Sequence, residues 1–242
     1  MRIRRSPSLN FPPCEILVPL TELTGNPLRF EAKGGRTKSA HQLVQGFQGQ
    51  WKSKAELTIG TAGECILLPV IAIESAGHNV LPTVLAQYLA SATGKAVETS
   101  IVQINLAGHT GSDGWHRLAH PAMFDGKVQT GARYWLVDDF VGMGGTLANL
   151  RGFIEASGGY VIGCSALTGR ADSSTLRLDS ATLEKLRSKH GSLDDWWRWR
   201  FGYGTDCLTF AEARFLNRAE NVDRVRDRMA AAGRRARIKG KP

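Results

Sequence analysis

The apolar positions along the chain follow two periods, one typical of strands and one typical of helices. Short continuous apolar runs have the length of strands buried on both faces of a sheet, and they fall at residues 65–73, 97–106, 133–141 and 160–167. Between these runs, residues 80–93 and 146–157 repeat their apolar positions every three or four residues, as amphipathic helices do. Strands that alternate with helices at this spacing form parallel β–α–β units. The sequence therefore predicts an α/β fold, a parallel sheet flanked by helices.

The N-terminal segment has a weaker pattern than this core. Residues 1–36 are rich in turn-forming residues, and their one short apolar run, at 16–20, suits an edge strand because it contains Pro19. Residues 38–55 have a weak helical pattern. We therefore expect an edge strand and a helical stretch before the core.

The C-terminal region is predicted to be helical. Residues 180–189 form one helix, and Thr209 with Glu212 has the spacing of a capping box at the start of another. We expect this last helix to run to about Ala232. The chain then divides into a variable N-terminal segment (1–56), a core (57–170) and a helical, basic C-terminal appendage (171–242).

Composition limits the class of protein. With 242 residues, 42% of them apolar and 22% charged, the chain suits one globular α/β domain with additions. No apolar run approaches the roughly 20 residues of a membrane span, and no apolar stretch of a secretory signal follows the basic N-terminus. The four cysteines lie far apart in sequence without a C-x-x-C pair, which favours reduced thiols and a cytoplasmic location.

Charge is concentrated at the C-terminal end. Of the net charge of +9, residues 214–242 contribute +7, from ten basic and three acidic residues. Such a tail can bind the phosphate backbone of a nucleic acid, or it can be a solvated helix end, which we favour. The run 194–201, DDWWRWRF, can likewise stack on bases or pack its tryptophans into a core, and we favour packing.

The most informative stretch is 133–151, RYWLVDDFVGMGGTLANLR. Asp138 and Asp139 end a buried strand, at the carboxyl edge where open α/β sheets bind ligands. A glycine-rich turn at 142–145 and a helix opening at Thr146 then offer backbone N–H groups and partial positive charge to an anion. Because the acids can accept hydrogen bonds from vicinal hydroxyls, directly or beside Mg²⁺, the pattern predicts a site for a ribose 5-phosphate.

This segment resembles the phosphoribosyl pyrophosphate (PRPP) motif of type I phosphoribosyltransferases. The apolar strand, the acid pair, the short loop of small residues and the final Thr146 all agree with that motif, and the resemblance covers about 57–170. A Walker P-loop would need Lys before the Ser/Thr, where Gly145 stands, and a dinucleotide fingerprint would begin directly after the strand. A receiver domain also has acids at a strand end, but it does not require GMGGT. The resemblance implies a type I phosphoribosyltransferase-like fold.

The resemblance also implies roles for individual residues. Asp138 and Asp139 would be catalytic, holding the ribose hydroxyls and, directly or through water, Mg²⁺. The turn after the first core strand would bind pyrophosphate through Ser75, Ala76 and Gly77. The 5-phosphate would be bound by Gly142, Met143, Gly144, Gly145 and Thr146.

The long polar connection 107–128 corresponds to a flexible catalytic loop in the family. Arg117 and Lys127 are its candidates for pyrophosphate, and three histidines are candidates for proton transfer, namely His109, His116 and His120. Among these we select Arg117 and His116 as catalytic. The three histidines could instead bind a metal, although no cysteine supports such a site.

We expect the chain to transfer a phosphoribosyl group from PRPP to a nitrogenous base or another nitrogen acceptor, with Mg²⁺ as cofactor. Family members that act on hypoxanthine and guanine carry an acid where this chain has Gly142, so that mechanism is disfavoured and the acceptor stays open. The resemblance also suggests a homodimer. The alternative is a regulator that senses PRPP or a nucleotide on the same fold and binds nucleic acid through its basic tail.

Overall fold

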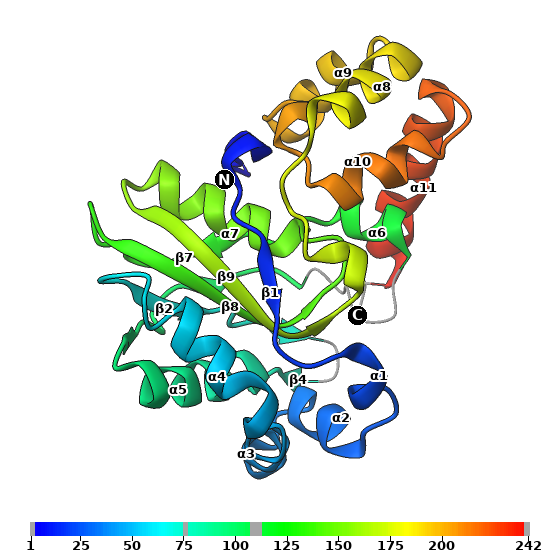
Figure 1. Ribbon diagram of the computed structural model, residues 1–242. Coiled ribbons are helices and arrows are strands. Elements are labelled where there is room, and N and C mark those ends of the chain that lie inside the picture. Colours follow the sequence, from blue (N-terminus) through cyan, green and yellow to red (C-terminus); the bar gives the residue numbers. More distant parts are fainter. Residues whose placement is uncertain (1–2, 75–76, 107–112, 240–242) are drawn as a thin grey trace.

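A parallel sheet forms the centre of the protein. The computed structural model describes residues 3–74, 77–106 and 113–239. Five strands pair in the order β1-β9-β8-β2-β5, and every neighbouring pair is parallel (Figure 1). They are β1 (Cys14–Ile16), β2 (Ile66–Pro69), β5 (Ala96–Val97), β8 (Arg133–Val141) and β9 (Tyr160–Gly169). The predicted α/β fold is confirmed, and the edge strand of the N-terminal segment is β1.

Side chains of the sheet alternate between two hydrophobic layers. Trp135 and Val137 of β8 face one layer, while Tyr134 and Leu136 face the other. The first layer is covered by α3 (Thr37–Gly46), α4 (Gln48–Thr58) and α5 (Leu81–Thr93), and the second by α7 (Gly145–Ala156) (Figure 1). Because both faces of β8 are buried, only its carboxyl end is free to meet a ligand.

The prediction of one strand at 97–106 is wrong. Strand β5 stops at Val97, and the Glu98 carboxylate accepts the N–H of Ser100 in the segment that follows. The second half of the predicted strand forms β6 (Val102–Gln103), which pairs antiparallel with β7 (Phe124–Asp125). The turn after β2 contains a second small antiparallel pair, β3 (Ile73–Glu74) with β4 (Gly77–His78).

Helices of the C-terminal region form a third core. It contains α6 (Gly114–Ala119), α8 (Ser180–His190), α9 (Leu193–Phe201), α10 (Phe210–Asn217) and α11 (Val222–Lys239), around the fully buried Trp197. The capping box of Thr209 and Glu212 is confirmed. The prediction of a single last helix is wrong. Helix α10 ends at Asn217, and the Asn221 side chain accepts the N–H of Arg224 at the start of α11.

The connection 107–128 is not one irregular loop, since α6 and β7 lie within it and α6 packs against α10 and α11. The N-terminal segment also contains two short helices, α1 (Leu20–Leu23) and α2 (Pro27–Lys33). Single-turn 3₁₀ helices lie at Ser8–Asn10, Ala171–Ser173 and Thr205–Cys207. In the described part of the chain, no helix is long and apolar enough to cross a membrane.

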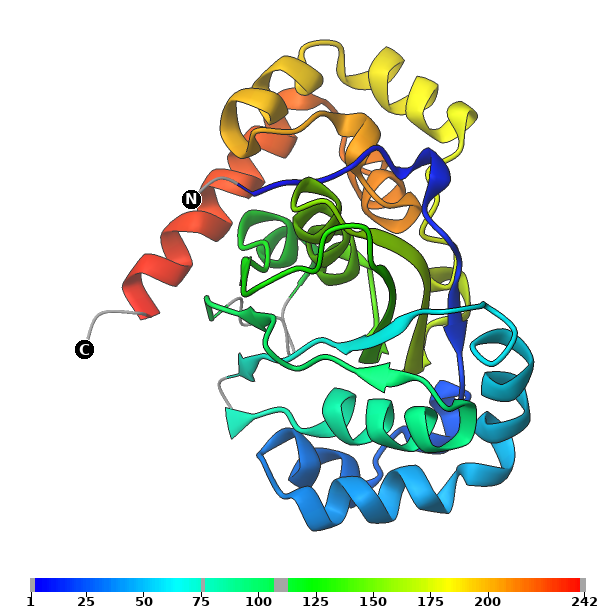
Figure 2. The ribbon, with the colours of Figure 1, turned by 90° about the vertical axis from the view of Figure 1, so that its left-hand side faces the viewer.

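The first residues of the chain pass between α7 and the C-terminal helices (Figure 2). Their path depends on Gly152 in the middle of α7. A Cβ atom at this position would collide with the backbone carbonyl of Arg4 and contact Arg5. Glycine therefore stands at a helix interior, where it is normally unfavourable, because the N-terminal segment crosses α7 at this point.

We predict that Gly152→Ala lowers the free energy of unfolding by about 1–3 kcal/mol, because the added methyl group meets backbone that cannot easily move. Urea denaturation measures this change. Gly233→Ala in α11 is the matched control, since no atom lies within 4 Å of its Cβ and alanine there should stabilise the helix by up to about 1 kcal/mol. Equal stabilisation by both substitutions would contradict the close crossing.

Candidate functional site

The acid pair lies at the carboxyl end of β8, and its two side chains point to opposite faces of the sheet. Asp138 continues the alternation of Tyr134 and Leu136, and Asp139 continues that of Trp135 and Val137. Both are buried, with exposed fractions of 7% and 5%. The two carboxylates therefore meet different partners although they are adjacent in sequence.

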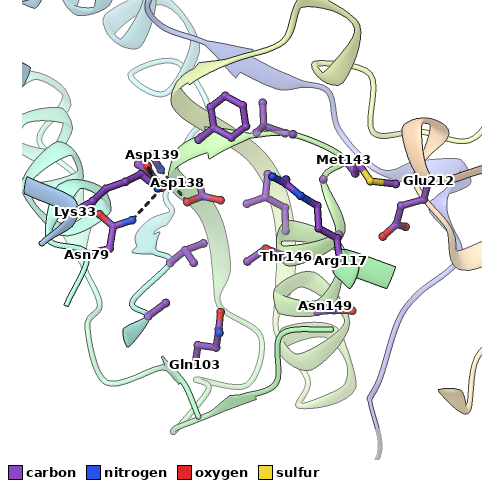
Figure 3. A pocket seen from close by; sticks show the side chains of 18 of the residues that line it. Lys33, Asn79, Gln103, Arg117, Asp138, Asp139, Met143, Thr146, Asn149 and Glu212 are labelled. Carbon is purple, nitrogen blue, oxygen red and sulfur yellow. Dashed lines mark hydrogen bonds and ion pairs between the residues drawn. The ribbon is translucent and has the colours of Figure 1, made fainter. Parts of the chain in front are cut away.

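Asp139 is held in its ionised form by groups from the N-terminal half. Its Oδ2 lies 2.9 Å from Nζ of Lys33, which ends α2, and its Oδ1 accepts a hydrogen bond of 3.1 Å from Asn79 (Figure 3). Burial alone would raise the pKa of Asp139, but the charges of Lys33 and Arg29 and the Asn79 amide lower it below its ordinary value. Asn79 also accepts the N–H of Leu81, although the N-cap position of α5 is occupied by Val80.

Asp138 has the opposite electrostatic environment. Burial and the negative charge of Asp139 raise its pKa well above the ordinary value for aspartate. Its Oδ1 accepts the backbone N–H of Asp139 at 2.8 Å. The pKa values of the two adjacent acids are therefore shifted in opposite directions.

The loop from Gly142 to Gly144 joins β8 to α7 next to these acids. Gly144 has a φ of 78°, in the left-handed region, and a side chain there would also collide with Leu176. Helix α7 begins at Gly145, so the N–H groups of its first turn have no acceptor within the helix. These groups, the partial positive charge of the helix and the Thr146 hydroxyl suit a bound anion.

A buried ion pair between Arg5 and Glu212 helps to hold the end of the loop in place. The guanidinium of Arg5 contacts the Glu212 carboxylate through both terminal nitrogens, at 2.6 and 2.9 Å. Arg5 also donates to the Asn149 side chain and to the carbonyl of Gly145. On the other side, the Thr209 hydroxyl donates to the Met143 carbonyl at 2.5 Å. The N-terminal segment and α10 together fix the loop in place.

The acid pair and the loop line the same cavity, whose volume is about 280 Å³ (Figure 3). Arg117 reaches this cavity from α6, and a Cβ atom on Gly142 would lie 2.6 Å from its Nη1. Burial and the charge of Arg170 lower the pKa of Arg117. Four cationic side chains line the cavity against three acidic ones, and the cations are Arg5, Arg29, Lys33 and Arg117.

The predicted site residues do not all reach the cavity. Those that line it are Asp138, Asp139, Arg117, Gly142, Met143, Gly144, Gly145 and Thr146. Among the described residues, His116 and Gly77 are not part of this lining. His116 stacks its ring on His120 at 4.3 Å, and the backbone of Gly77 packs against Gly34. Ser75, Ala76 and His109 lie outside the described residues.

The structure adds site residues that sequence analysis missed. Arg29 and Lys33 lie on a short helix in the turn-rich segment, where no motif indicates them. Glu212 was found only as part of a capping box, and Gln103 only as part of a strand. The one sequence signal for Arg29 and Lys33 was the pair of buried acids, because buried carboxylates require cationic partners somewhere in the chain.

A metal ion would have few protein ligands here. Within the described ranges, no three side chains of His, Cys, Asp or Glu converge to hold a metal. Asp138 and Asp139 point to opposite faces of β8 and Asp139 already pairs with Lys33, so the two acids could hold a Mg²⁺ ion only if it kept several waters and was bound mainly by the phosphates of a ligand. The four cysteines are all buried and free.

We predict opposite pH effects from the two acids. The protonated Asp138 stabilises the fold below the ordinary aspartate pKa of 3.8, and this contribution is lost as the pH rises through its raised folded pKa. Asp138→Asn should therefore increase the free energy of unfolding at neutral pH. Asp139→Asn should lower it by up to about 3 kcal/mol, because Lys33 is left without its carboxylate.

Urea denaturation between about pH 3 and about pH 9 tests both effects. The contribution of Asp139 should be present above 3.8 and lost as the pH falls through its lowered folded pKa. Similar destabilisation by both substitutions at neutral pH would contradict the assignment of different protonation states.

We predict that Gly142→Ala weakens ligand binding without unfolding the protein. The new methyl group displaces the end of the flexible Arg117 side chain, so stability should change by less than about 0.5 kcal/mol. Losing one charged hydrogen bond from Arg117 should weaken the binding of PRPP about tenfold or more, as measured by calorimetry. Gly46→Ala, which has open space around its Cβ, should bind like the wild type.

No protein-family model matches the chain. The chain is 38% identical over 232 residues to a protein named TraN of Escherichia coli, with 96% of this chain and 52% of TraN aligned. It is 36% identical over 154 residues to an uncharacterized protein of Haemophilus influenzae, with 63% of this chain and 34% of that protein aligned. The chain thus spans about half the length of one curated relative and a third of the other.

Two solved structures similar to the chain are an adenine phosphoribosyltransferase and a UMP synthase. The adenine phosphoribosyltransferase has a TM-score of 0.36 at 14% identity, covering 58% of this chain and 75% of its own. The Leishmania donovani UMP synthase has a TM-score of 0.35 at 15% identity, covering 74% of this chain and 33% of its own. Both TM-scores lie below 0.5.

Proposed function

We propose that the chain binds PRPP and transfers its phosphoribosyl group to a nitrogen acceptor. The observation that carries this proposal is the shared cavity of the acid pair and the glycine loop. Acceptors for a sugar diol and donors for a phosphate lie at the end of one strand and the start of the next helix. Ribose 5-phosphate carries both groups, separated by its ring.

In this proposal the 5-phosphate lies in the loop from Gly142 to Thr146. The first-turn N–H groups of α7 and the Thr146 hydroxyl donate to its oxygens. The Arg5–Glu212 pair and Thr209 keep the loop in one conformation, so little order has to be created on binding.

The ribose hydroxyls then lie against the acid pair. Asp139 stays ionised beside Lys33, and its oxygens can each accept a further hydrogen bond. Asp138, which favours its proton in the free protein, becomes a better acceptor when cationic groups approach. Buried carboxylates next to the sugar also favour the positive charge that develops on the ribose during transfer.

Arg117 suits the pyrophosphate end of the ligand. It enters the cavity from α6, beside the loop, and adds to the positive charge of Arg29 and Lys33. In the reaction the bond from C1 to pyrophosphate breaks and a bond from C1 to the acceptor nitrogen forms. Mg²⁺ bound to the leaving group would neutralise part of its charge, and Asp138 and Asp139 are the residues that would hold the ion.

We expect calorimetric titration of PRPP with Mg²⁺ to show micromolar binding to the wild type. The double substitution Asp138→Asn/Asp139→Asn should weaken it at least tenfold, because two acceptors of ligand hydroxyl groups lose their charge. Asp125→Asn removes an exposed acid on β7 and serves as the control with unchanged affinity. Failure of the wild type to bind PRPP would contradict the proposal.

Pyrophosphate release with a panel of nitrogenous bases separates a transferase from a sensor. A transferase should release pyrophosphate with one class of base, and Arg117→Ala should lower the rate more than it lowers PRPP affinity. If PRPP binds tightly but no base causes release of pyrophosphate, the function of the site is sensing and not transfer.

A further inference from the structure

The tryptophan-rich helix α9 divides its aromatic residues between the core and the surface. Trp197 is fully buried and packs against Phe201 and Tyr203, as the packing interpretation of this run predicts. Trp199 is different, because 80% of its surface is exposed. A tryptophan this exposed contributes almost nothing to the core and leaves its aromatic face open to a partner.

An open hollow lies beside this tryptophan, between α9 and α11. Trp196, Trp199 and Arg200 line it from α9, where their spacing of three and four residues places them on one face of the helix. From α11 it is lined by Arg226, Asp227 and Met229, among others. Arg226 also donates to the Ser192 hydroxyl and so fixes α11 against the start of α9. The two helices on either side of the hollow are therefore held together, and aromatic and cationic side chains line it.

Positive charge continues from the hollow along α11. The sequence of this helix contains seven basic and two acidic residues, and one of the acids, Asp223, pairs with Arg226 at 3.6 Å. Arg224 and Arg228 are exposed. With 18 residues the helix is about 27 Å long, enough to follow several consecutive phosphates of an extended strand.

We infer that the face formed by Trp196, Trp199, Arg200 and α11 binds single-stranded nucleic acid. A base stacks on Trp199 at the rim of the hollow, while the arginines of α11 neutralise the phosphates on either side. Stacking on an aromatic ring and backbone neutralisation are the two interactions that hold single strands without reading their sequence. This site is separate from the acid pair and its loop and does not depend on the function proposed for them.

Two features favour single strands over other anionic partners. An anionic membrane or an acidic protein would also be attracted by α11, but a base between two phosphates matches a tryptophan that lies in a hollow lined by arginines of two helices. Double-stranded nucleic acid keeps its bases stacked on each other and would leave Trp199 without a partner.

Fluorescence anisotropy with a labelled oligodeoxythymidine of about 15 nucleotides tests the site. Trp199→Ala should weaken binding at least tenfold, Trp199→Phe should recover most of the affinity, and Tyr160→Ala, which removes an exposed aromatic ring from the start of β9, should change nothing. Arg228→Gln should reduce the slope of log affinity against log salt by about 0.7. Heparin, which has charge but no bases, should bind Trp199→Ala as it binds the wild type.

Three results would overturn the inference. The first is equal oligonucleotide affinity of the wild type and Trp199→Ala. The second is no oligonucleotide binding at about 50 mM salt, where phosphate contacts are strongest. The third is binding to phosphatidylglycerol vesicles that requires Trp199 while the oligonucleotide does not compete, which would assign this face to a membrane surface.

Discussion

The buried ion pair of Arg5 and Glu212 determines the shape of the binding cavity. Arg5 comes from the N-terminal segment, Glu212 from α10, and between them lie Asn149 and the carbonyl of Gly145 at the start of α7. A pair buried to this extent adds little net stability, but removing either partner leaves a charge without compensation and costs about 3–5 kcal/mol. Glu212 also completes the capping box of α10, whose Thr209 hydroxyl donates to the Met143 carbonyl. The loop from Gly142 to Gly144 is thus positioned by tertiary contacts as well as by its glycines.

The acid pair shows how one strand end supplies two chemically different carboxyl groups. The alternation of β8 directs Asp139 toward α2 and α5, where Lys33 and Asn79 surround it, and directs Asp138 toward the face covered by α7. Against the effect of burial, Lys33 lowers the pKa of Asp139, whereas burial and the charge of Asp139 raise the pKa of Asp138. The two adjacent carboxyl groups of one cavity therefore differ in how readily they give up a proton.

The sequence could predict the elements that depend on interactions between neighbouring residues, but not those that depend on contacts between distant segments of the chain. The strand 133–141, the acids, the glycine loop and the helix after them are a local pattern, and β8 and α7 follow it closely. The capping box and the end of α5 at Gly94 are equally local. Arg5, Lys33 and Glu212 reach the cavity from segments far apart in the chain, and no local spacing indicates them. The stretch 97–106 has the composition of one strand, but pairing with β7 rather than β2 decides its second half.

The separation of Arg5 and Glu212 by 207 positions has a consequence for how the protein is made. While the chain emerges from the ribosome, β8 and its acids are complete long before α10 is synthesised. Until then the loop has no support on the side of Thr209, and Arg5 has no carboxylate. The sheet can assemble early, but the cavity becomes a binding site only when the last helices close on the first residues. A ligand of this cavity would therefore stabilise only chains that have been synthesised beyond Glu212 and could not guide the earlier steps of folding.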